Sequence, residues 1–432
     1  MNKRKKVLFS LLFSGSFFLS CCALCGFSLT KVKKGVVANG IAVGGMRLSD
    51  AVDLVREETA KRLPPLTVTS PAGSVTVKYP ELSFTDDAES VLKKAKEGES
   101  VSVSVRRQWA DAETCIQALC DQNAKKAVDA EVEFSPSGFT YRREKTGLVS
   151  DYNATLELVS AALEGDVEEV ALVMREYGPE LTEEILRERT KKLSSFTTRF
   201  DKSNSDRVHN IRLAARKLAG AVIEPHGEFS FNARVGKRTE ENGFKESVII
   251  MDGEFVKGVG GGVCQLSTTL FNAALTAGLE IKESRNHSLS VSYVSPSLDA
   301  MVSSYSDLKI VNPHSTPVYL NAYLGEGSVS VECFGLSDGY RYRTESVVLY
   351  RLAPPPESVV EGEEDRVLRA AKEGIASESY LLKYDKSGKL ISRRLLRRDN
   401  YAVVQGIRQV KKQPSATGPD ENQPKEEGEP EQ

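Results

Sequence analysis

The sequence has few cysteines, one tryptophan and no excess of either charge. Its 432 residues include 7 Cys, and 58 Lys and Arg stand against 60 Asp and Glu, giving a net charge of −2. So few scattered cysteines exclude a disulfide scaffold, and the balanced charge excludes a general field that would hold nucleic acid. With 40% hydrophobic and 27% charged residues, the chain has the composition of globular domains, and its length predicts about two to four of them.

Long apolar runs are also absent, with one exception near the N-terminus. Residues 7–29 carry no charge and follow four basic residues at positions 3–6. A run of this length suffices for a membrane span of about 20 residues, and the basic cluster favours a cytoplasmic N-terminus. We therefore expect residues 1–34 to be a single-pass membrane anchor with the rest of the chain extracytoplasmic. A cleaved signal peptide and a lipoprotein site at Cys22 remain alternatives.

Residues 35–180 contain an internal repeat. The turn Ser70-Pro71-Ala72-Gly73 recurs as Ser135-Pro136-Ser137-Gly138, 65 positions later (135 minus 70). Each copy, 35–107 and 108–180, is expected to form a small α+β unit. Its apolar residues have helical spacing in some segments and alternate with polar residues, as in strands, in others. Neither copy clusters Cys, His or paired carboxylates, so binding or spacing is the expected role. The expected helices are 49–63, 87–97, 111–123 and 152–163, and the expected strands are 66–70, 74–79, 101–105, 130–134, 139–143 and 170–174.

The rest of the chain divides by composition. We expect a helical connector at 181–195, with Thr182 as its N-cap, and a mixed α/β domain at 196–335 with antiparallel strands and one central helix. A Pro-rich and acidic linker follows at 336–365. A small β unit at 366–412 is expected to contain a hairpin that turns at 385–388, and the tail 413–432 is expected to be disordered. The predicted fold class is therefore α+β multidomain.

One segment has a pattern that suggests chemistry. Three glycines, 260–262, precede Cys264, and an apolar helical stretch follows to about residue 277. The first turn of a helix has free N–H groups and a dipole that favours negative charge, so a thiolate at Cys264 would be stabilised. The amides of residues 262–264 would be placed to receive an oxyanion. A buried, inert cysteine remains the alternative.

A nucleophilic thiol needs a base and a group that orients the base. His287 and Asp299 follow Cys264 in the chain, and the order Cys, His, Asp is chemically sensible, because an imidazole can take the thiol proton while a carboxylate holds its tautomer. Arg238 is a candidate clamp for a substrate carboxylate, since its fork suits a bidentate pair. The alternatives are a structural histidine and an arginine that only braces its turn. No ligand spacing for zinc is present, and no cofactor is expected.

The same residues carry a family resemblance. The segment 195–325 is similar to the VanW domain, the upstream repeats resemble peptidoglycan-binding modules, and 366–412 is similar to a G5 domain. The motifs that carry the VanW resemblance are Gly227-Glu228-Phe229-Ser230-Phe231-Asn232, Val235-Gly236-Lys237-Arg238-Thr239, Asn242-Gly243-Phe244, Gly260-Gly261-Gly262-Val263-Cys264-Gln265-Leu266-Ser267-Thr268-Thr269-Leu270, His287-Ser288, Tyr293-Val294 and Asp299-Ala300.

The resemblance implies a cell-wall protein on the outer side of the membrane. Some VanW-domain proteins are regarded as L,D-transpeptidases, so Cys264 would form an acyl-enzyme with a peptidoglycan stem peptide, with His287 as base and Asp299 orienting it. The expected partners are stem peptides or glycan, and the membrane through the N-terminal segment. Two alternatives remain: a related peptidoglycan amidohydrolase or carboxypeptidase that uses water in place of the acceptor amine at the same site, and a non-enzymatic peptidoglycan-binding or envelope-assembly protein. The expected oxyanion and substrate contacts are Gly261, Gly262, Val263, Gln265, Arg238 and Tyr293.

Overall fold

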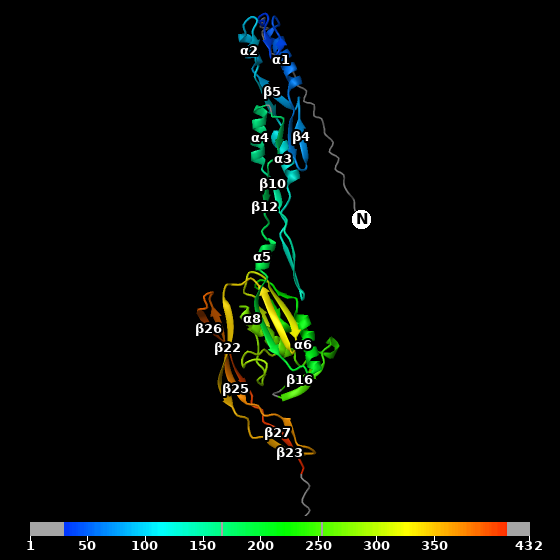
Figure 1. The fold of residues 1–432 in the computed structure, drawn as a ribbon, viewed down its shortest axis with the longest axis vertical. Helices are drawn as coiled ribbons and strands as arrows, with labels where there is room; N and C mark the ends of the chain where they lie inside the picture. The colour runs from blue at the N-terminus through cyan, green and yellow to red at the C-terminus, as the bar shows by residue number, and fades with distance from the viewer. Residues whose placement is uncertain (1–29, 166, 252–253, 413–432) are drawn as a thin grey trace, which may run out of the picture. The chain divides into compact units, whose positions relative to one another are not determined.

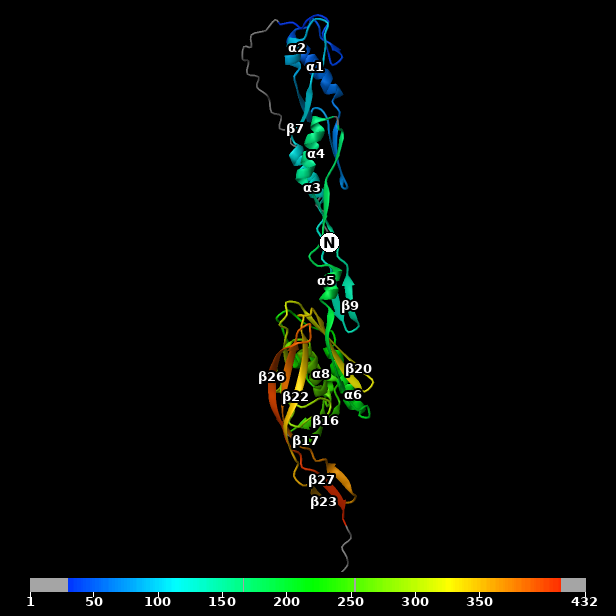
Figure 2. The same ribbon diagram turned by 60° about the vertical axis from the view of Figure 1, so that its left-hand side comes forward.

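The computed structural model describes residues 30–165, 167–251 and 254–412, and these form two compact units (Figures 1 and 2). The first unit comprises the chain up to Ala127 together with Thr146–Gly178, and the second comprises Val128–Lys145 and the chain from Pro179. Both mix helices and small sheets, so the predicted α+β class is confirmed at this level. The expected apolar anchor segment 7–29 and the tail 413–432 lie outside the described residues, and the described part of the chain contains no helix that is long and apolar enough to cross a bilayer.

The first unit contains four helices and ten strands among its described residues. In chain order these are β1 (Val37–Ala38), β2 (Ile41–Ala42), α1 (Leu48–Arg62), β3 (Leu66–Ser70), β4 (Gly73–Val77), β5 (Leu82–Asp86), α2 (Ala88–Lys94), β6 (Ser100–Val101), β7 (Val105–Trp109), α3 (Ala112–Asn123), β10 (Gly147–Ser150), α4 (Tyr152–Glu164), β11 (Glu169–Ala171) and β12 (Met174–Tyr177).

The two sequence repeats interlock within this unit. Strand β11 of the second copy pairs in parallel with β3 of the first, joining Val170 to Val68. The apolar residues of β3 and β4 share one core with α3 and α4, whose buried side chains include Ile116 and Val159. A separate core surrounds α1 and α2. The hairpin of the first copy therefore buries its apolar face against the second copy, which is how a small unit with little core of its own gains buried area.

The second unit contains the following elements. They are β8 (Glu131–Ser135), β9 (Gly138–Arg142), α5 (Glu183–Glu188), β13 (Lys191–Arg199), α6 (Ser205–Leu218), β14 (Ala221–Ile223), β15 (Glu228–Ser230), α7 (Phe231–Val235), the 3-10 helix η1 (Glu240–Asn242), β16 (Glu246–Met251), β17 (Glu254–Val259), α8 (Val263–Thr276), β18 (Glu280–Glu283), β19 (Lys309–Val311), β20 (Val318–Gly325), β21 (Ser328–Gly335), β22 (Arg341–Leu352), β23 (Ser358–Gly362), β24 (Arg366–Arg369), β25 (Gly374–Tyr384), β26 (Leu390–Tyr401) and β27 (Ile407–Lys411).

Helix α8 is the centre of the second unit. It packs on the antiparallel sheet β13-β21-β20-β14, on helix α6 and on strand β22 (Figure 1). Twelve of its 14 residues are buried. A helix that is covered on all sides must be largely apolar, and its few polar side chains must find partners inside the protein. Those partners determine the candidate site.

The C-terminal strands form a sheet against this core. Strand β25 lies between β22 and β26, and all three are antiparallel (Figure 2). The segment 341–352, which composition assigns to a linker, is the long strand β22, and its pairing with β25 runs from Arg341 opposite Tyr384 to Leu352 opposite Gly374. Composition missed this strand because it is rich in charged residues and half exposed, so its apolar residues do not alternate clearly.

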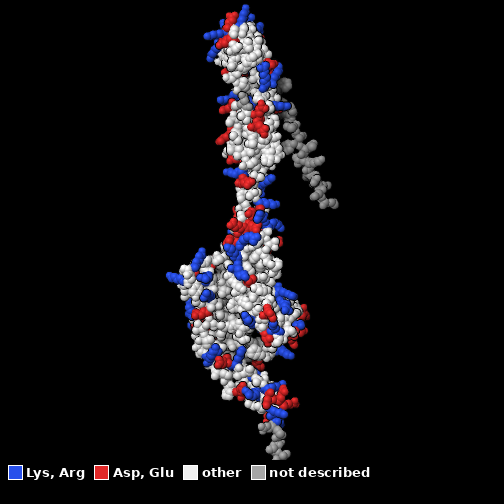
Figure 3. Space-filling model, viewed as in Figure 1, with Lys and Arg blue, Asp and Glu red and all other residues white. Residues whose placement is uncertain are grey.

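Two further features agree with the sequence. Thr182 caps α5, with its hydroxyl accepting a hydrogen bond from the Ile185 N–H at 3.3 Å. The helical connector predicted at 181–195 is wrong beyond Glu188, because β13 begins at Lys191 and pairs with β21. Lysine and arginine are interspersed with acidic residues on the visible face of each unit, without a large patch of one sign (Figure 3). The interspersed charges match the near-zero net charge of the sequence.

Candidate active site

The glycine turn before α8 is shaped by contacts with the chain itself. Gly260 and Gly262 have φ of +90° and +106°. Residues other than glycine rarely adopt this backbone conformation. A Cβ at Gly261 would lie 2.6 Å from the Val248 carbonyl oxygen, and one at Gly262 would lie 2.9 Å from a side-chain carbon of Ile211. The glycines therefore admit the neighbouring hairpin and α6, so that protein atoms approach the turn closely.

Helix α6 is hydrogen-bonded to the glycine turn. Its buried Asn210 donates to the carbonyl oxygens of Gly261 at 3.0 Å and Lys245 at 2.9 Å. The amide of Val263 donates to Gly260 at 3.1 Å. The amides of Gly262 and Cys264 meet no acceptor within residues 30–165, 167–251 and 254–412. Two of the three amides expected to stabilise an oxyanion are thus available, and that of Val263 is already engaged.

The polar side chains of α8 attach the loop that carries His287 and Asp299. The Ser267 hydroxyl donates to the Ala300 carbonyl at 2.6 Å, and the Thr268 hydroxyl accepts from the Ala300 N–H at 2.9 Å. One turn further, Asn272 donates to the Leu298 carbonyl at 2.8 Å. All three side chains are buried. Buried hydrogen bonds of this kind are costly to break, so the loop is held at a defined height along the helix.

Cys264 lies in the first turn of α8 and is half-buried. Its thiol donates to the Val302 carbonyl oxygen at 3.3 Å, and its sulfur accepts from the Val302 N–H at 3.5 Å. The helix begins at Val263, and its N-cap residue Gly262 provides no side-chain cap. The sulfur therefore sits where the helix dipole and free amides favour a negative charge.

His287 and Asp299 are in contact. The ring Nδ1 of His287 lies 2.5 Å from Asp299 Oδ2, and the His287 backbone N–H donates to the same oxygen at 2.7 Å. Both residues are almost fully buried, at 5% and 1% exposed. Because Nδ1 is engaged by the carboxylate, Nε2 is the ring nitrogen left to face the thiol.

The electrostatics couple the three groups. Burial alone would raise the pKa of Cys264, but a hydrogen bond and charge from His287, the Val302 N–H and the charge of Arg238 together lower it. Burial would lower the pKa of His287, yet Asp299 and Cys264 outweigh burial and raise it to about 9. Burial would also raise the pKa of Asp299, whereas His287, Arg397 and Tyr401 lower it. The arrangement favours thiolate, imidazolium and carboxylate side by side.

The other residues predicted to contact substrate, Arg238, Tyr293 and Gln265, differ in how far their polar groups are already bonded. Arg238 donates from Nη1 to Asn232 at 2.7 Å, and its buried Nη2 has no partner among the described residues. Tyr293 lies beside Thr268 and Cys264, where burial and the thiol charge raise its pKa. The Gln265 amide is buried and engaged by three groups, since it accepts from Arg207 and donates to Thr198 and Arg199. Arg238 and Tyr293 thus have polar groups near the sulfur, and Gln265 braces the helix.

Sequence reasoning missed two residues at this site. Arg397 and Tyr401 of strand β26 both bond the Asp299 carboxylate, at 3.1 Å and 2.5 Å. They are about 100 positions away in the chain (98 and 102), so no local pattern links them to Asp299. The polar residues of α8 are a more local signal, because Ser267, Thr268 and Asn272 are buried and buried polar side chains need partners inside the protein.

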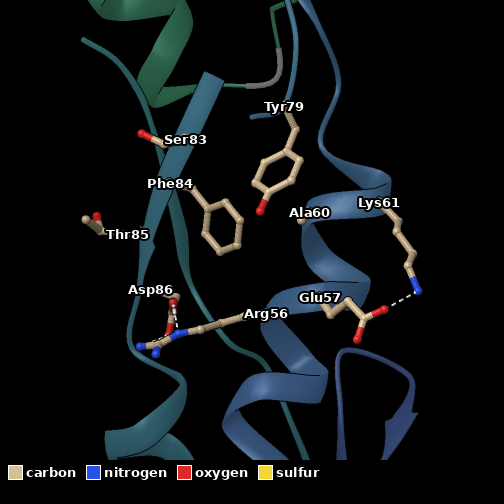
Figure 4. Close-up of a pocket in the computed structure, with 9 residues that line it drawn as sticks. All are labelled: Arg56, Glu57, Ala60, Lys61, Tyr79, Ser83, Phe84, Thr85 and Asp86. Carbon is tan, nitrogen blue, oxygen red and sulfur yellow. Dashed lines mark hydrogen bonds and ion pairs between the residues drawn. The ribbon is translucent and has the colours of Figure 1, made fainter. Parts of the chain in front are cut away.

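A separate cavity lies in the first unit, between α1 and β5. Its volume is about 740 Å³. The rings of Tyr79 and Phe84 project between the helix and the strand, and an ion pair of 2.7 Å joins Arg56 to Asp86 at one end (Figure 4). Across the described parts of both units, no group of three or more His, Cys, Asp or Glu side chains is arranged to hold a metal ion.

Fold and site together define a mixed α+β domain with a cysteine, histidine and aspartate aligned at the start of a central helix. Residues 206–334 match the family described as VanW like protein. For this part of the chain, the resemblance to the VanW domain that the sequence predicts is confirmed. The match ends before β22, so Arg397 and Tyr401 lie beyond it.

Two relatives are similar over parts of their length. YoaR, an uncharacterized protein of Bacillus subtilis (strain 168), is 42% identical over 146 residues, which cover 34% of this chain and 48% of that protein. The vancomycin B-type resistance protein VanW of Enterococcus faecalis (strain ATCC 700802 / V583) is 33% identical over 82 residues, covering 19% of this chain and 30% of that protein. The chain therefore matches less than half of either relative's length.

Proposed function

We propose that this protein acts at the cell wall as a cysteine-dependent L,D-transpeptidase on peptidoglycan stem peptides. The observation that carries the proposal is the 2.5 Å contact of His287 with Asp299, together with a Cys264 thiol at a helix N-terminus whose pKa His287 lowers. Nucleophile, base and orienting carboxylate are thereby present in the order that acyl transfer uses. The name of the Enterococcus faecalis relative associates that protein with vancomycin resistance, which supports a role in the cell envelope, with residues 1–34 as the proposed anchor.

The chemistry proceeds in two half-reactions. The Cys264 thiolate attacks the carbonyl carbon of the amide between an L-centre and the terminal D-residue, and the free amides of Gly262 and Cys264 receive the oxyanion. The C–N bond breaks, and the leaving amine takes its proton from the His287 imidazolium. An acceptor amine then attacks the thioester, passes a proton to His287 and releases the thiolate. The free Nη2 of Arg238 is available for the carboxylate of the donor peptide.

Intact-protein mass spectrometry tests this proposal. The full chain is incubated with a purified tetrapeptide muropeptide, and the wild type is expected to gain the mass of the acyl group while a D-amino acid is released. Cys264→Ala is expected to gain nothing. Cys120→Ala serves as the matched control, because that buried thiol has a raised pKa and lies in the first unit. A wild type that forms no adduct and releases no D-amino acid contradicts the enzymatic proposal.

The cavity of the first unit supports a second candidate function, the binding of glycan or peptide without chemistry. Two aromatic rings beside paired charges offer a stacking face and hydrogen-bonding groups. The single tryptophan of the chain, Trp109, is paired with Leu82 on β5, the strand that lines the cavity. We expect soluble glycan fragments to change Trp109 fluorescence, and Phe84→Ala to abolish the change. An unchanged spectrum at millimolar ligand contradicts this candidate.

A further inference from the structure

The Asp299 carboxylate lies between the histidine loop and the C-terminal sheet. Its Oδ2 receives both hydrogen bonds from His287, at 2.5 Å and 2.7 Å. Its Oδ1 receives the Tyr401 hydroxyl at 2.5 Å and the Arg397 guanidinium at 3.1 Å. The same guanidinium nitrogen also donates to the Asp299 backbone carbonyl. One carboxylate oxygen therefore serves the candidate base, and the other is held entirely by β26.

Strand β26 also holds the backbone of the loop. Ser297 is fully buried and has a φ of +63°, a conformation that costs on the order of 1–3 kcal/mol for a residue other than glycine. Its N–H donates to the Tyr401 hydroxyl at 2.6 Å, and its own hydroxyl bonds that of Ser377 at 2.7 Å. The Ala402 N–H donates to the Ser288 carbonyl at 2.8 Å. The C-terminal sheet thus fixes the loop on both sides of the histidine and aspartate.

We propose that Arg397 and Tyr401 are positioning residues of the Cys264 site, which act by keeping Asp299 ionised and aimed at His287. The inference rests on the proposed function for the role of Cys264, but its first consequence concerns Asp299 alone. A buried carboxylate without these two donors takes up a proton at a higher pH, and a neutral Asp299 no longer stabilises the imidazolium. The titratable and charged groups that act on Asp299 or are acted on by it are His287, Arg397, Tyr401, Asp399 and Tyr293.

The first test is the pH profile of Cys264 alkylation in the full chain. For Tyr401→Phe and Arg397→Met, the rate at pH 6 is expected to fall about tenfold, which is the effect of about one pKa unit on the thiolate fraction. At pH 9 the rate is expected to change less than at pH 6, because a rise in the thiol pKa removes a smaller share of the thiolate as the pH approaches and passes that pKa. Arg397→Lys keeps the charge and is expected to recover part of the loss. An equal fall at every pH indicates a merely structural role and overturns the inference.

Matched controls come from the same sheet. Tyr380→Phe and Arg398→Met remove a hydroxyl and a guanidinium that bond Glu378 and do not contact Asp299. Both are expected to keep the wild-type profile. A profile that shifts as much in these controls as in the Arg397 and Tyr401 variants overturns the assignment to those two residues.

A second measurement is independent of thiol chemistry. The chain has four histidines, so ¹⁵N-histidine labelling with His287→Asn for assignment isolates the His287 ring signals. On acidification, the signal change that marks protonation of Asp299 is expected at higher pH in Tyr401→Phe than in the wild type. No difference overturns the inference even if Cys264 is acylated. A clear difference without any acyl adduct preserves the inference and contradicts the proposed enzyme.

Discussion

Cys264 differs from the other described cysteines by its charged neighbours. Burial raises the pKa of Cys115 and Cys120, and it raises that of Cys333 to about 12. None of these thiols has a cation among the causes of its shift, whereas Cys264 has His287 and Arg238. At the scale of single residues, an imidazolium beside the sulfur outweighs the cost of burial.

This difference predicts selective alkylation. Since the pKa of Cys264 is lowered and those of the thiols in α3 are raised, Cys264 is expected to react with iodoacetamide below pH 8, while Cys115 and Cys120 react only at alkaline pH. His287→Ala is expected to slow Cys264 about tenfold at pH 7, the effect of about one pKa unit. Peptide mapping by mass spectrometry measures each site separately. Equal rates for all the thiols contradict the assignment.

The glycine turn and the loop that carries His287 and Asp299 meet at the site, and different interactions hold each of them. The glycine turn is held by backbone conformation and close packing against α6. The loop that carries His287 and Asp299 is held by hydrogen bonds from α8 and from β26. At the scale of elements, the geometry of the site therefore depends on residues of α6, α8 and β26 that pack around it or bond to it.

Gly262→Ala tests the turn. The added Cβ would meet Ile211 at 2.9 Å with φ at +106°, so we expect a loss of about 2–4 kcal/mol in the free energy of unfolding. Gly236→Ala is the control, since φ is +82° there but nothing lies within 4 Å of the added carbon, and about 1 kcal/mol is expected. Denaturant titration measures both. Equal losses would mean that packing against α6 contributes nothing.

Thr268→Val tests the loop attachment. The variant leaves the buried Ala300 N–H without its acceptor, which costs about 1–3 kcal/mol. The control is Thr276→Val, because that hydroxyl bonds only carbonyls of its own helix, and less than about 1 kcal/mol is expected. Thr268→Val should also slow Cys264 alkylation, whereas Thr276→Val should not. A stable and fully reactive Thr268→Val contradicts the role given to α8.

The whole molecule consists of two units with separate cores. The core of the second unit gathers α6, α8 and the sheets around them, while the first unit has two smaller cores. Contacts within each unit are dense, and the chain passes between the units more than once, because residues 128–145 belong to the second. The hairpin β8–β9 in that stretch packs Phe134 and Phe139 against Tyr319.

Separate cores predict separate unfolding. We expect two transitions in scanning calorimetry, because each unit buries its own apolar residues. Ile116 is fully buried in the first unit. Ile116→Ala is expected to lower the free energy of unfolding of that unit by about 2–5 kcal/mol and so to lower the temperature of one transition. Gly262→Ala is expected to lower only the other. A single transition that both substitutions shift contradicts independent unfolding.

Local pattern predicted many elements closely. The helix predicted at 49–63 is found at 48–62, and the strand predicted at 66–70 has the same bounds in the structure. The helix predicted to have Cys264 in its first turn begins at Val263. Such elements follow from apolar spacing and turn residues that lie close together in the chain. The trio Cys264, His287 and Asp299 was predicted from chemical type and order, and the structure places the three together.

The sequence by itself determined the α+β class, the repeat, the VanW domain and the helix start that presents Cys264, because each is encoded by residues within a few turns of one another. Tertiary structure alone decided that β11 completes the sheet of the first repeat and that Arg397 and Tyr401 hold Asp299. Both are pairings between distant segments, chosen by which apolar faces and buried charges find partners when the whole chain packs, and no local spacing records that choice.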